Sequence, residues 1–234
     1  MRAILLAGGY GTRLQPITNT IPKCLLPING IPLLEIWLDN LSRAGIGPYL
    51  INTHYLADQV ERHFLTSPHK HEVRLVYEPE LLGTAGTLFA NIDFFQDEDG
   101  FLIHADNYSL CDLTRLIKAH RERPADCLMT ILTFCTDDLS SCGIVEIDER
   151  GVVVRFHEKV AHPPGNRANG AVYILSKEFI ADILPHAGKV QDISTQLICQ
   201  YLGRIYTYHT DAAHIDIGTP ASYIKALGHG SGAT

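Results

Sequence analysis

The chain has 234 residues, 46% of them hydrophobic and 19% charged, and its formal net charge is −7 at pH 7. This length suits one α/β domain with a large core, and the acidic balance argues against a general nucleic-acid-binding surface. No run approaches the roughly 18 apolar residues of a membrane span, and the N-terminal residues read as a strand rather than a signal peptide. The six scattered cysteines lack metal-type spacing, so we expect a cytoplasmic protein with reduced thiols and with neither nucleic-acid nor membrane partners.

The first part of the chain alternates strand-like with helix-like segments. This alternation predicts an α/β fold, a Rossmann-like three-layer sandwich in which helices cover both faces of a mostly parallel central sheet. Sheets of this type bind ligands at the carboxyl ends of their strands. The expected strands are Arg2–Ala7, Tyr49–Asn52, Val73–Tyr77, Phe101–His104 and Cys127–Phe134, and the expected helices are Pro32–Ala44, Ala57–Phe64, Thr84–Ile92 and Leu113–Arg121.

The second part of the chain is richer in strands. Asp148-Glu149-Arg150-Gly151 separates two strand-like runs and predicts a hairpin. No linker divides the two parts, so we expect a single domain over residues 1–228, followed by a flexible tail at 229–234. The expected strands are Ile144–Ile147, Val152–His157, Ala171–Leu175 and Arg204–His209, and the expected helices are Lys177–Leu184, Ile193–Tyr201 and Pro220–Leu227.

A glycine-rich turn, Gly8-Gly9-Tyr10-Gly11-Thr12-Arg13, follows the first strand. Backbone N–H groups in such a turn can point at one oxyanion, because glycine tolerates positive φ and carries no side chain to block the approach. Arg13 adds a planar fork of donors suited to phosphate, and Lys23 adds a second cation on a proline-stiffened loop. Together they predict a polyphosphate site.

Other glycine loops match less well. The Walker pattern ends in Gly-Lys-Ser or Gly-Lys-Thr, which the chain lacks, and the dinucleotide pattern requires a third glycine where Leu14 stands. By contrast, the combination of Gly-Gly-x-Gly-Thr-Arg-Leu-x-Pro-x-Thr with Pro-Lys-x-Leu-Leu-Pro fixes many spaced positions. The alternative is a tight turn with two solvated charges.

These motifs resemble those of the sugar-1-phosphate nucleotidylyltransferases. The resemblance spans most of the chain in the family's order, and some family members append a left-handed β-helix, whereas here we expect only the transferase core. The further matching segments are Leu82–Gly86, Ala105-Asp106, Glu158–Val160, Asn169-Gly170 and Asp216–Pro220.

The resemblance implies an enzyme that joins a nucleoside triphosphate to a sugar 1-phosphate and releases pyrophosphate. A phosphate monoester is already anionic at neutral pH, so the reaction needs positioning and charge neutralisation more than a general base. Residues 1–135 would form a nucleotide-binding half, and residues 136–228 a strand-rich, sugar-binding half. The sequence leaves open whether the chain forms a homo-oligomer.

The implied catalytic residues are three cations: Arg13 on the leaving pyrophosphate, Lys23 on the α-phosphate or the incoming sugar phosphate, and Lys159 on the sugar phosphate. Glu78 either pairs with the amino groups of a guanine or is a solvated strand end, and the second interpretation is favoured. The implied nucleotide-binding residues are Leu6, Ala7, Gly8, Gly9, Gly11, Thr12, Arg13, Glu78, Gly83, Thr84 and Ala85.

Two aspartates, Asp106 and Asp216, match the positions at which the family binds Mg²⁺. Each alone could instead cap a helix or form a turn, but as a pair they favour a hard divalent cation shared with the phosphates. The family commonly has Asn-Gly-Asp or Gly-Asp where this chain has His104-Ala105-Asp106. This departure leaves the local geometry around Asp106 open.

Sugar recognition requires donors and acceptors for hydroxyl groups. Glu158 can accept from a pair of hydroxyls, and Asn169 can both donate and accept. The alternatives are a solvated strand end at Glu158-Lys159 and a simple turn at Asn169-Gly170. The implied sugar-binding residues are Asn107, Gly143, Glu158, Lys159, Asn169 and Gly170.

The later motifs resemble those of the short guanylyltransferases that act on mannose or manno-heptose 1-phosphates. Glu-Lys-Val replaces the frequent Glu-Lys-Pro, and Pro-Lys-Cys departs from the form typical of thymidylyltransferases. We therefore expect GTP, with UTP, dTTP or CTP as alternatives. A catalytically silent subunit that senses nucleotide-sugars is a further alternative, although it would not need the pyrophosphate-side cations.

Overall fold

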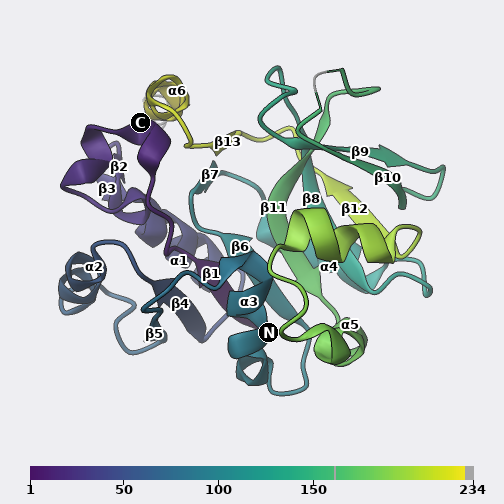
Figure 1. Ribbon diagram of the computed structural model, residues 1–234, viewed down its shortest axis with the longest axis horizontal. Helices are drawn as coiled ribbons and strands as arrows, with labels where there is room; N and C mark the ends of the chain where they lie inside the picture. The colour runs from purple at the N-terminus through teal and green to yellow at the C-terminus, as the bar shows by residue number, and fades with distance from the viewer. Residues whose placement is uncertain (161, 230–234) are drawn as a thin grey trace. The chain divides into compact units, whose positions relative to one another are not determined.

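The computed structural model describes residues 1–160 and 162–229 (Figure 1). The predicted fold class is confirmed, since the protein has a Rossmann-like mixed α/β fold with a large, mostly parallel central sheet. Of the predicted tail, His229 is the last residue of a helix, and residues 230–234 lie outside the described residues. Within the described chain, no helix combines the length and the apolar character needed to cross a bilayer.

The chain divides into two compact units that alternate along the sequence. We call Arg2–Leu81, Ile103–Cys111 and the residues from Ala212 onward the glycine-loop unit. The strand-rich unit consists of Met1, Leu82–Leu102 and Asp112–Asp211. These units are defined by packing, and the predicted division into nucleotide-binding and sugar-binding halves stays a prediction.

Three parallel strands form the sheet of the glycine-loop unit. β1 (Arg2–Leu6) pairs with β4 (Tyr49–Thr53), and β4 pairs with β5 (Val73–Tyr77). The middle strand β4 is buried along its whole length, as its apolar sequence predicts. The helices α1 (Leu33–Arg43) and α2 (Ala57–Phe64) lie within one residue of their predicted bounds. The sequence pattern was therefore sufficient to place these elements.

A second group of short elements in the glycine-loop unit was not predicted. β7 (Asn107–Ser109) pairs antiparallel with β13 (His214–Asp216), and β2 (Pro27–Ile28) pairs with β3 (Ile31–Pro32). Single 3₁₀ turns follow the glycine loop. The helix α6 (Pro220–His229) comes after β13 and, unlike these short elements, was predicted, over Pro220–Leu227. Apolar side chains from these segments share one core cluster that includes Leu14, Leu26, Leu33, Tyr108, Ile215, Ile217 and Ala226.

The strand-rich unit has a mixed sheet. β8 (Met129–Cys135) lies between β11 (Arg167–Leu175), its antiparallel neighbour, and β12 (Ile205–His209), its parallel neighbour. β9 (Gly143–Ile147) pairs antiparallel with β11 and with β10 (Val153–Glu158). The predicted hairpin between the last two strands is confirmed.

Four further elements complete the description. Helices α4 (Leu113–Arg121) and α5 (Lys177–Ile183) match the prediction closely, whereas α3 (Gly83–Ala90) ends earlier than expected. β6 (Gly100–His104) leads from the strand-rich unit into the glycine-loop unit.

Two predictions in the strand-rich unit were wrong in detail. The expected helix over Ile193–Tyr201 is a wide π turn at Ile193–Leu197 followed by a 3₁₀ turn at Ile198–Tyr201. Gln196 Oε1 accepts from the N–H groups of Gln191 and Asp192, at 2.7 and 3.0 Å, and so ties the preceding residues to this turn. The expected strand Ala171–Leu175 is only the end of β11, which carries an irregularity between Asn169 and Tyr173.

Candidate nucleotide and phosphate site

The glycine loop leaves β1 and turns sharply at Gly11, whose φ is 64°. A Cβ at Gly11 would lie 2.9 Å from Thr18 Cγ2, and Thr18 Oγ1 donates to Gly11 O at 2.8 Å. The left-handed backbone and this close contact together require glycine. At Gly9 the opposite holds, because no atom lies within 4 Å of the position that a Cβ would take. The loop is therefore fixed at Gly11 and open at Gly9, where a ligand can approach the backbone.

Asn52 holds the start of the loop and was missed by the sequence analysis. Its Oδ1 accepts from Ala7 N at 2.7 Å, so its Nδ2 faces Glu78 Oε1, 3.1 Å away. Glu78 is only 3% exposed, which shows that the favoured interpretation of a solvated strand end was wrong. A polar Asn at the carboxyl end of a buried strand was the available signal, because buried amides need partners.

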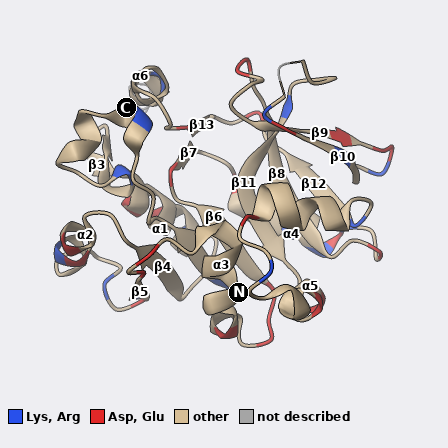
Figure 2. Ribbon diagram, in the orientation of Figure 1, with Lys and Arg blue, Asp and Glu red and all other residues tan. Residues whose placement is uncertain are grey.

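Four predicted charged residues form one cluster in the glycine-loop unit. Lys23 Nζ lies 2.7 Å from Asp106 Oδ2 and 3.4 Å from Asp216 Oδ1. Arg13 Nη2 lies 3.8 Å from Asp216 Oδ2. The Lys23 side chain is 9% exposed and the Arg13 side chain 60% exposed. Lys23 is the buried residue that bridges the two carboxylates of this cluster. Figure 2 shows the Lys and Arg residues in blue and the Asp and Glu residues in red along the whole ribbon.

The pairing of β7 with β13 is what brings Asp216 to Asp106. In this ladder Asp216 is opposite Asn107, and Ile217 N donates to Asp106 O at 3.2 Å. Trp37 Nε1 donates to Asn107 O at 2.7 Å and anchors β7 on helix α1. The positions of the carboxylates are therefore set by backbone pairing and by the apolar cluster beneath it.

The charges of the cluster influence one another. Burial acts to raise the pKa of Asp106, but the charge of Lys23, the nearby His104 and hydrogen bonds outweigh it, and the net effect lowers the pKa of this carboxyl. Asp106 is therefore ionised at neutral pH. Burial, with a contribution from Asp106, raises the pKa of Cys24 to about 12, so this thiol is a neutral packing group.

Gly218, immediately after β13, shapes the position of Arg13. A Cβ at Gly218 would lie 2.8 Å from Arg13 Nη2 and 3.1 Å from Asp216 Oδ2. A larger residue would therefore displace the guanidinium or the carboxylate from the positions that they hold here. The Ile-Asp-Ile-Gly-Thr-Pro motif contained this signal, although the residue was not among those predicted for the site.

The two aspartates suit a divalent cation held jointly with phosphates. Both carboxylates already direct an oxygen at one cation, the Lys23 ammonium, and oxygen donors are the ligands that Mg²⁺ prefers. Among residues 1–160 and 162–229, no group of three or more His, Cys, Asp or Glu side chains is arranged to hold a metal ion. The residues therefore fit a metal that takes the rest of its ligands from the substrate phosphates and water.

The predicted nucleotide loop of the strand-rich unit is engaged with protein groups. Gly83 has φ 78°, and a Cβ there would lie 2.5 Å from Gln191 O. Ala85 N donates to the same carbonyl at 3.0 Å. Thr84 Oγ1 donates to Asp192 Oδ2 at 3.2 Å and accepts from Ile193 N at 2.9 Å. These contacts join the start of α3 to the segment before the π turn, and nucleotide binding by these residues stays a prediction.

Most predicted sugar-binding residues lie on β9, β10 and β11. Glu158 is opposite Gly143, and a Cβ at Gly143 would lie 2.7 Å from Glu158 Oε2 and collide with the ring of Phe156. Lys159 Nζ lies 3.5 Å from Glu158 Oε1, and its side chain is 63% exposed. The absence of a side chain at Gly143 therefore leaves room for the carboxylate of Glu158 and the ring of Phe156.

Asn169 is fixed by its own strand. Its Nδ2 donates to Tyr173 Oη at 2.9 Å, and its Oδ1 accepts from Ala171 N at 3.0 Å. Ala171 has φ 53°, which is unusual for a residue with a side chain and marks the irregularity of β11. Burial raises the pKa of Tyr173 to about 12, so its hydroxyl remains protonated at neutral pH.

The predicted residues fall into two groups, one in each compact unit. Asn107 belongs to the glycine-loop unit, where it is buried and its Nδ2 donates to His104 O at 3.3 Å. The glycine-loop unit holds Leu6, Ala7, Gly8, Gly9, Gly11, Thr12, Arg13, Lys23, Glu78, Asp106, Asn107 and Asp216, and the strand-rich unit holds Gly83, Thr84, Ala85, Gly143, Glu158, Lys159, Asn169 and Gly170. The expectation that Lys159 joins the same pocket as Lys23 stays a prediction.

An open glycine loop beside a paired-carboxylate cluster, on a Rossmann-like fold, is the arrangement expected of a nucleotide-handling protein. The comparison with known families agrees: residues 2–229 match the model of the nucleotidyl transferase family, and the chain belongs to that family.

Named relatives narrow the comparison. The chain is 31% identical to a UTP–glucose-1-phosphate uridylyltransferase of Synechocystis sp., covering 97% of this chain and 62% of the relative. It is also 31% identical to a D-glycero-alpha-D-manno-heptose 1-phosphate guanylyltransferase of Aneurinibacillus thermoaerophilus, covering 97% of this chain and 96% of the relative. Several curated relatives are longer, and the chain spans 61 to 62% of their length.

Solved structures share the fold. Two crystal structures of HddC from Yersinia pseudotuberculosis, one of them complexed with GMP-PN, match with TM-scores of 0.83 and 0.80. Their sequences are 26% and 25% identical to this chain, and the matches cover 98% of this chain and 99% of each solved chain.

Proposed function

We propose that the chain is a sugar-1-phosphate nucleotidylyltransferase. The observation that carries the proposal is the Lys23–Asp106–Asp216–Arg13 cluster beside an open glycine loop. Loop and cluster adjoin, since a Cβ at Gly11 would lie 3.4 Å from Lys23 Cβ. A cradle of N–H groups, two cations and two carboxylates in one unit suits a triphosphate with a divalent cation.

In the proposed reaction, a phosphate oxygen of the sugar 1-phosphate attacks the α-phosphorus of the triphosphate. The bond from that phosphorus to the bridging oxygen breaks, and pyrophosphate leaves with the electron pair. Both reactants are anions, so their approach depends on neutralisation and alignment. No proton has to be removed from the attacking phosphate, so the reaction needs no general base. This agrees with the cluster, in which both carboxylates form ion pairs with Lys23 or Arg13.

The residues of the glycine-loop unit would divide this work. The N–H groups of the loop near Gly9 hold the triphosphate, and the exposed Arg13 guanidinium holds the leaving pyrophosphate as a bidentate donor. Lys23, already between two carboxylates, neutralises the α-phosphate. A divalent cation on Asp106 and Asp216 would supply further neutralisation of the phosphate charge when bound.

The strand-rich unit would supply the sugar contacts. We assign Lys159 to the sugar phosphate, and Glu158 and Asn169 to sugar hydroxyls. The fixed orientation of Asn169 supports this assignment, because Tyr173 and the Ala171 N–H leave one amide proton and one oxygen lone pair for a ligand.

We propose GTP and a manno-configured heptose or mannose 1-phosphate as the substrates. The heptose guanylyltransferase relative and the GMP-PN complex of the HddC structure support this choice. UTP remains the main alternative, because a uridylyltransferase is equally similar in sequence.

We also propose that the protein works in the cytoplasm. All six cysteines are free thiols, and three of them are buried, as expected for a reducing compartment.

The test is pyrophosphate formation from ATP, GTP, CTP, UTP or dTTP, each combined with mannose, manno-heptose and glucose 1-phosphates and Mg²⁺. We expect the highest kcat/KM with GTP and a manno-configured partner. Turnover restricted to UTP and glucose 1-phosphate would overturn the substrate assignment. Binding without turnover in every combination would instead favour a regulatory subunit that senses nucleotide-sugars.

A further inference from the structure

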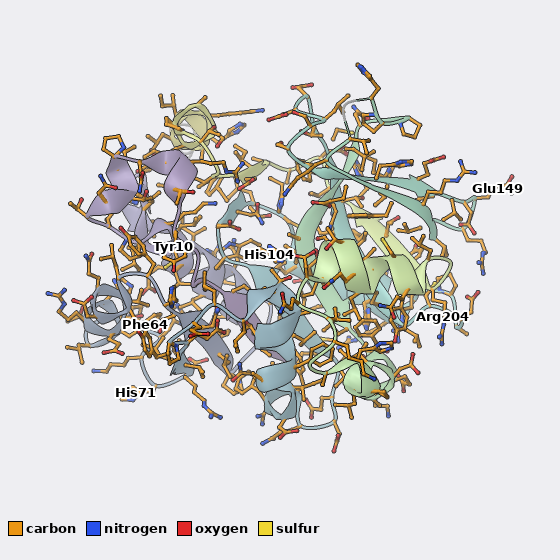
Figure 3. All side chains as sticks on the ribbon, in the orientation of Figure 1. Tyr10, Phe64, His71, His104, Glu149 and Arg204 are labelled. Atoms are coloured by element: carbon orange, nitrogen blue, oxygen red, sulfur yellow. The ribbon has the colours of Figure 1, made fainter. Side chains whose placement is uncertain are left out.

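Tyr10 stands at the tip of the glycine loop, between Gly9 and Gly11, and its side chain does not point freely into solvent. Its ring packs edge-on against His54, with centroids 5.1 Å apart at 87°, and tilted against Tyr55 at 5.6 Å (Tyr10 is labelled in Figure 3). A residue in such a loop would otherwise be expected to be mobile, because glycines on both sides permit many backbone conformations. The ring contacts therefore anchor the most flexible part of the cradle.

The hydrogen bonds of His54 determine its tautomer. His54 Nδ1 lies 2.7 Å from Glu78 O, and a carbonyl oxygen only accepts, so Nδ1 carries the proton. In the neutral ring Nε2 is then an acceptor, and it lies 2.8 Å from Tyr10 Oη. The Tyr10 hydroxyl donates to His54, and His54 donates to the backbone at Glu78. A continuous chain of donors thus links the loop tip to the end of β5.

A second connection runs parallel to the first. Asn52 accepts from Ala7 N and donates to the Glu78 carboxylate, so the start of the loop is tied to the same residue as its tip. Gly8 lies between the two connections, where a Cβ would be 3.1 Å from Asn52 Nδ2 and 3.2 Å from Leu81 Cδ2. The loop is therefore held at its start and at its tip against Glu78, the residue that follows β5.

We propose that Tyr10 and His54 are positioning residues that hold the glycine loop in its phosphate-binding conformation. The inference rests on the proposed function. An unanchored glycine loop would lose conformational entropy when it closes on a triphosphate, and this loss weakens binding. The Tyr10–His54 hydrogen bond imposes that order during folding. The Tyr10–His54 hydrogen bond should affect the binding of the triphosphate and of pyrophosphate only, because, among the described residues, neither of the two contacts one that is assigned to the sugar.

Two variants remove this hydrogen bond from opposite sides. Tyr10→Phe keeps the ring and loses the donor. His54→Asn retains an amide donor near the position of Nδ1, for Glu78 O, and loses the Nε2 acceptor. We expect each to raise the KM for GTP, and the KM for pyrophosphate in the reverse reaction, by about fivefold, the effect of one net hydrogen bond. The KM for the sugar 1-phosphate should not change, and the melting temperature should fall by no more than about 4 °C, the contribution of one net hydrogen bond.

The double variant and a matched control sharpen the test. Tyr10→Phe combined with His54→Asn should resemble either single variant, because both remove the same bond. Tyr77→Phe removes another exposed phenol at the end of β5 and should leave both KM values unchanged. Additive effects in the double variant, or a normal KM for GTP in Tyr10→Phe, would overturn the positioning role.

Calorimetric titration of GTP and of inorganic pyrophosphate separates this inference from the proposed function. A wild-type protein that turns over no nucleotide but binds GTP more tightly than Tyr10→Phe refutes the activity and supports the loop anchor. An active wild-type protein whose affinity for GTP equals that of Tyr10→Phe refutes the anchor and leaves the activity standing.

Discussion

The glycine-loop unit and the strand-rich unit hold their candidate functional groups in different ways. In the first, Lys23 is nearly buried between Asp106 and Asp216, and Arg13 lies against one of the same carboxylates. In the second, Lys159 is largely exposed and has one carboxylate neighbour at 3.5 Å. Lys23 is thus ordered by burial and by charge pairing with both carboxylates, whereas the exposed Lys159 retains its rotamer freedom.

This contrast has a consequence for catalysis. Groups that are ordered in advance stabilise developing charge without reorganising, and their loss lowers the rate of the chemical step. A group that becomes ordered only with its ligand contributes mainly to binding. We therefore expect substitutions in the charged cluster of the glycine-loop unit to act on kcat, and substitutions of the residues assigned to the sugar in the strand-rich unit to act on the KM for the sugar phosphate.

The largest effect is expected from Asp216→Asn. The amide keeps the shape of the side chain but loses the charge that pairs with Lys23 and Arg13 and that would hold the cation. We expect turnover to fall by a factor of about 10³ or more, since the metal and the two cations all lose a partner. Pyrophosphate release measures the loss, and an unchanged circular dichroism spectrum would show that the fold is intact.

Asp211→Asn provides the control for Asp216. Asp211 is a fully exposed aspartate in the strand-rich unit, so its substitution should leave the rate unchanged. A near-normal rate in Asp216→Asn would contradict the metal assignment.

The next largest effect concerns Arg13. Arg13→Ala removes the exposed guanidinium and should lower kcat by a factor of about 10², equivalent to about 3 kcal/mol of transition-state stabilisation, by analogy with a lost oxyanion donor. Binding of the sugar 1-phosphate should change far less. Steady-state kinetics with each substrate varied in turn gives both quantities, and equal effects on both would mean that the role is misassigned.

Gly218→Ala tests the same guanidinium without removing it. The added methyl group would lie 2.8 Å from Arg13 Nη2 and should reproduce part of the loss in kcat. Arg121→Ala, on the exposed side of α4, removes an arginine elsewhere and should have no effect.

The strong local patterns account for what the sequence predicted well. Helices α2 and α4 have the predicted bounds, because apolar residues recur at helical spacing and Asp112 caps α4 with its side chain. The glycine loop and the charged cluster were found because motifs with fixed spacing mark both. These features depend on residues that are close in sequence or on recognised patterns.

The parts that were not predicted depend on contacts between distant segments. β7 and β13 have three residues each and are separated by about a hundred residues, so neither shows a usable alternation. Their pairing nevertheless sets the distance between Asp106 and Asp216. The buried state of Glu78 likewise follows from Asn52 on another strand. The sequence could identify the members of the site, but the fold was needed to show what holds them.

A smaller effect is expected from Tyr173→Phe in the strand-rich unit. The substitution removes the hydroxyl that accepts from Asn169 Nδ2, so the Ala171 N–H is the remaining protein group that orients the amide. We expect the KM for the sugar 1-phosphate to rise about fivefold, with kcat and the KM for GTP nearly unchanged. Tyr206→Phe, on β12 of the same unit, is the control. A rise in the KM for GTP of the same size would contradict the separation of roles between the units.

The smallest expected effect is on stability and concerns the buried His120 of the strand-rich unit. Burial lowers the pKa of His120 despite the opposing influence of Asp99, whose Oδ2 lies 3.4 Å from Nε2. Below pH about 6.5 the unfolded chain gains a proton that the folded chain does not bind, so the free energy of unfolding should decrease as the pH falls from that value. The pKa of Asp99 is also lowered, chiefly by its hydrogen bond with His120, and this contribution is lost only below about pH 3.9.

His120→Gln isolates the contribution of His120, because glutamine keeps a donor near the position of Nε2 but does not titrate. Urea unfolding between pH 7 and pH 5 should give a flatter dependence on pH for this variant than for the wild type. The exposed His71 offers a matched substitution, and His71→Gln should retain the wild-type slope. If His120→Gln and the wild type lose stability in parallel over this range, His120 is not the source of the acid sensitivity.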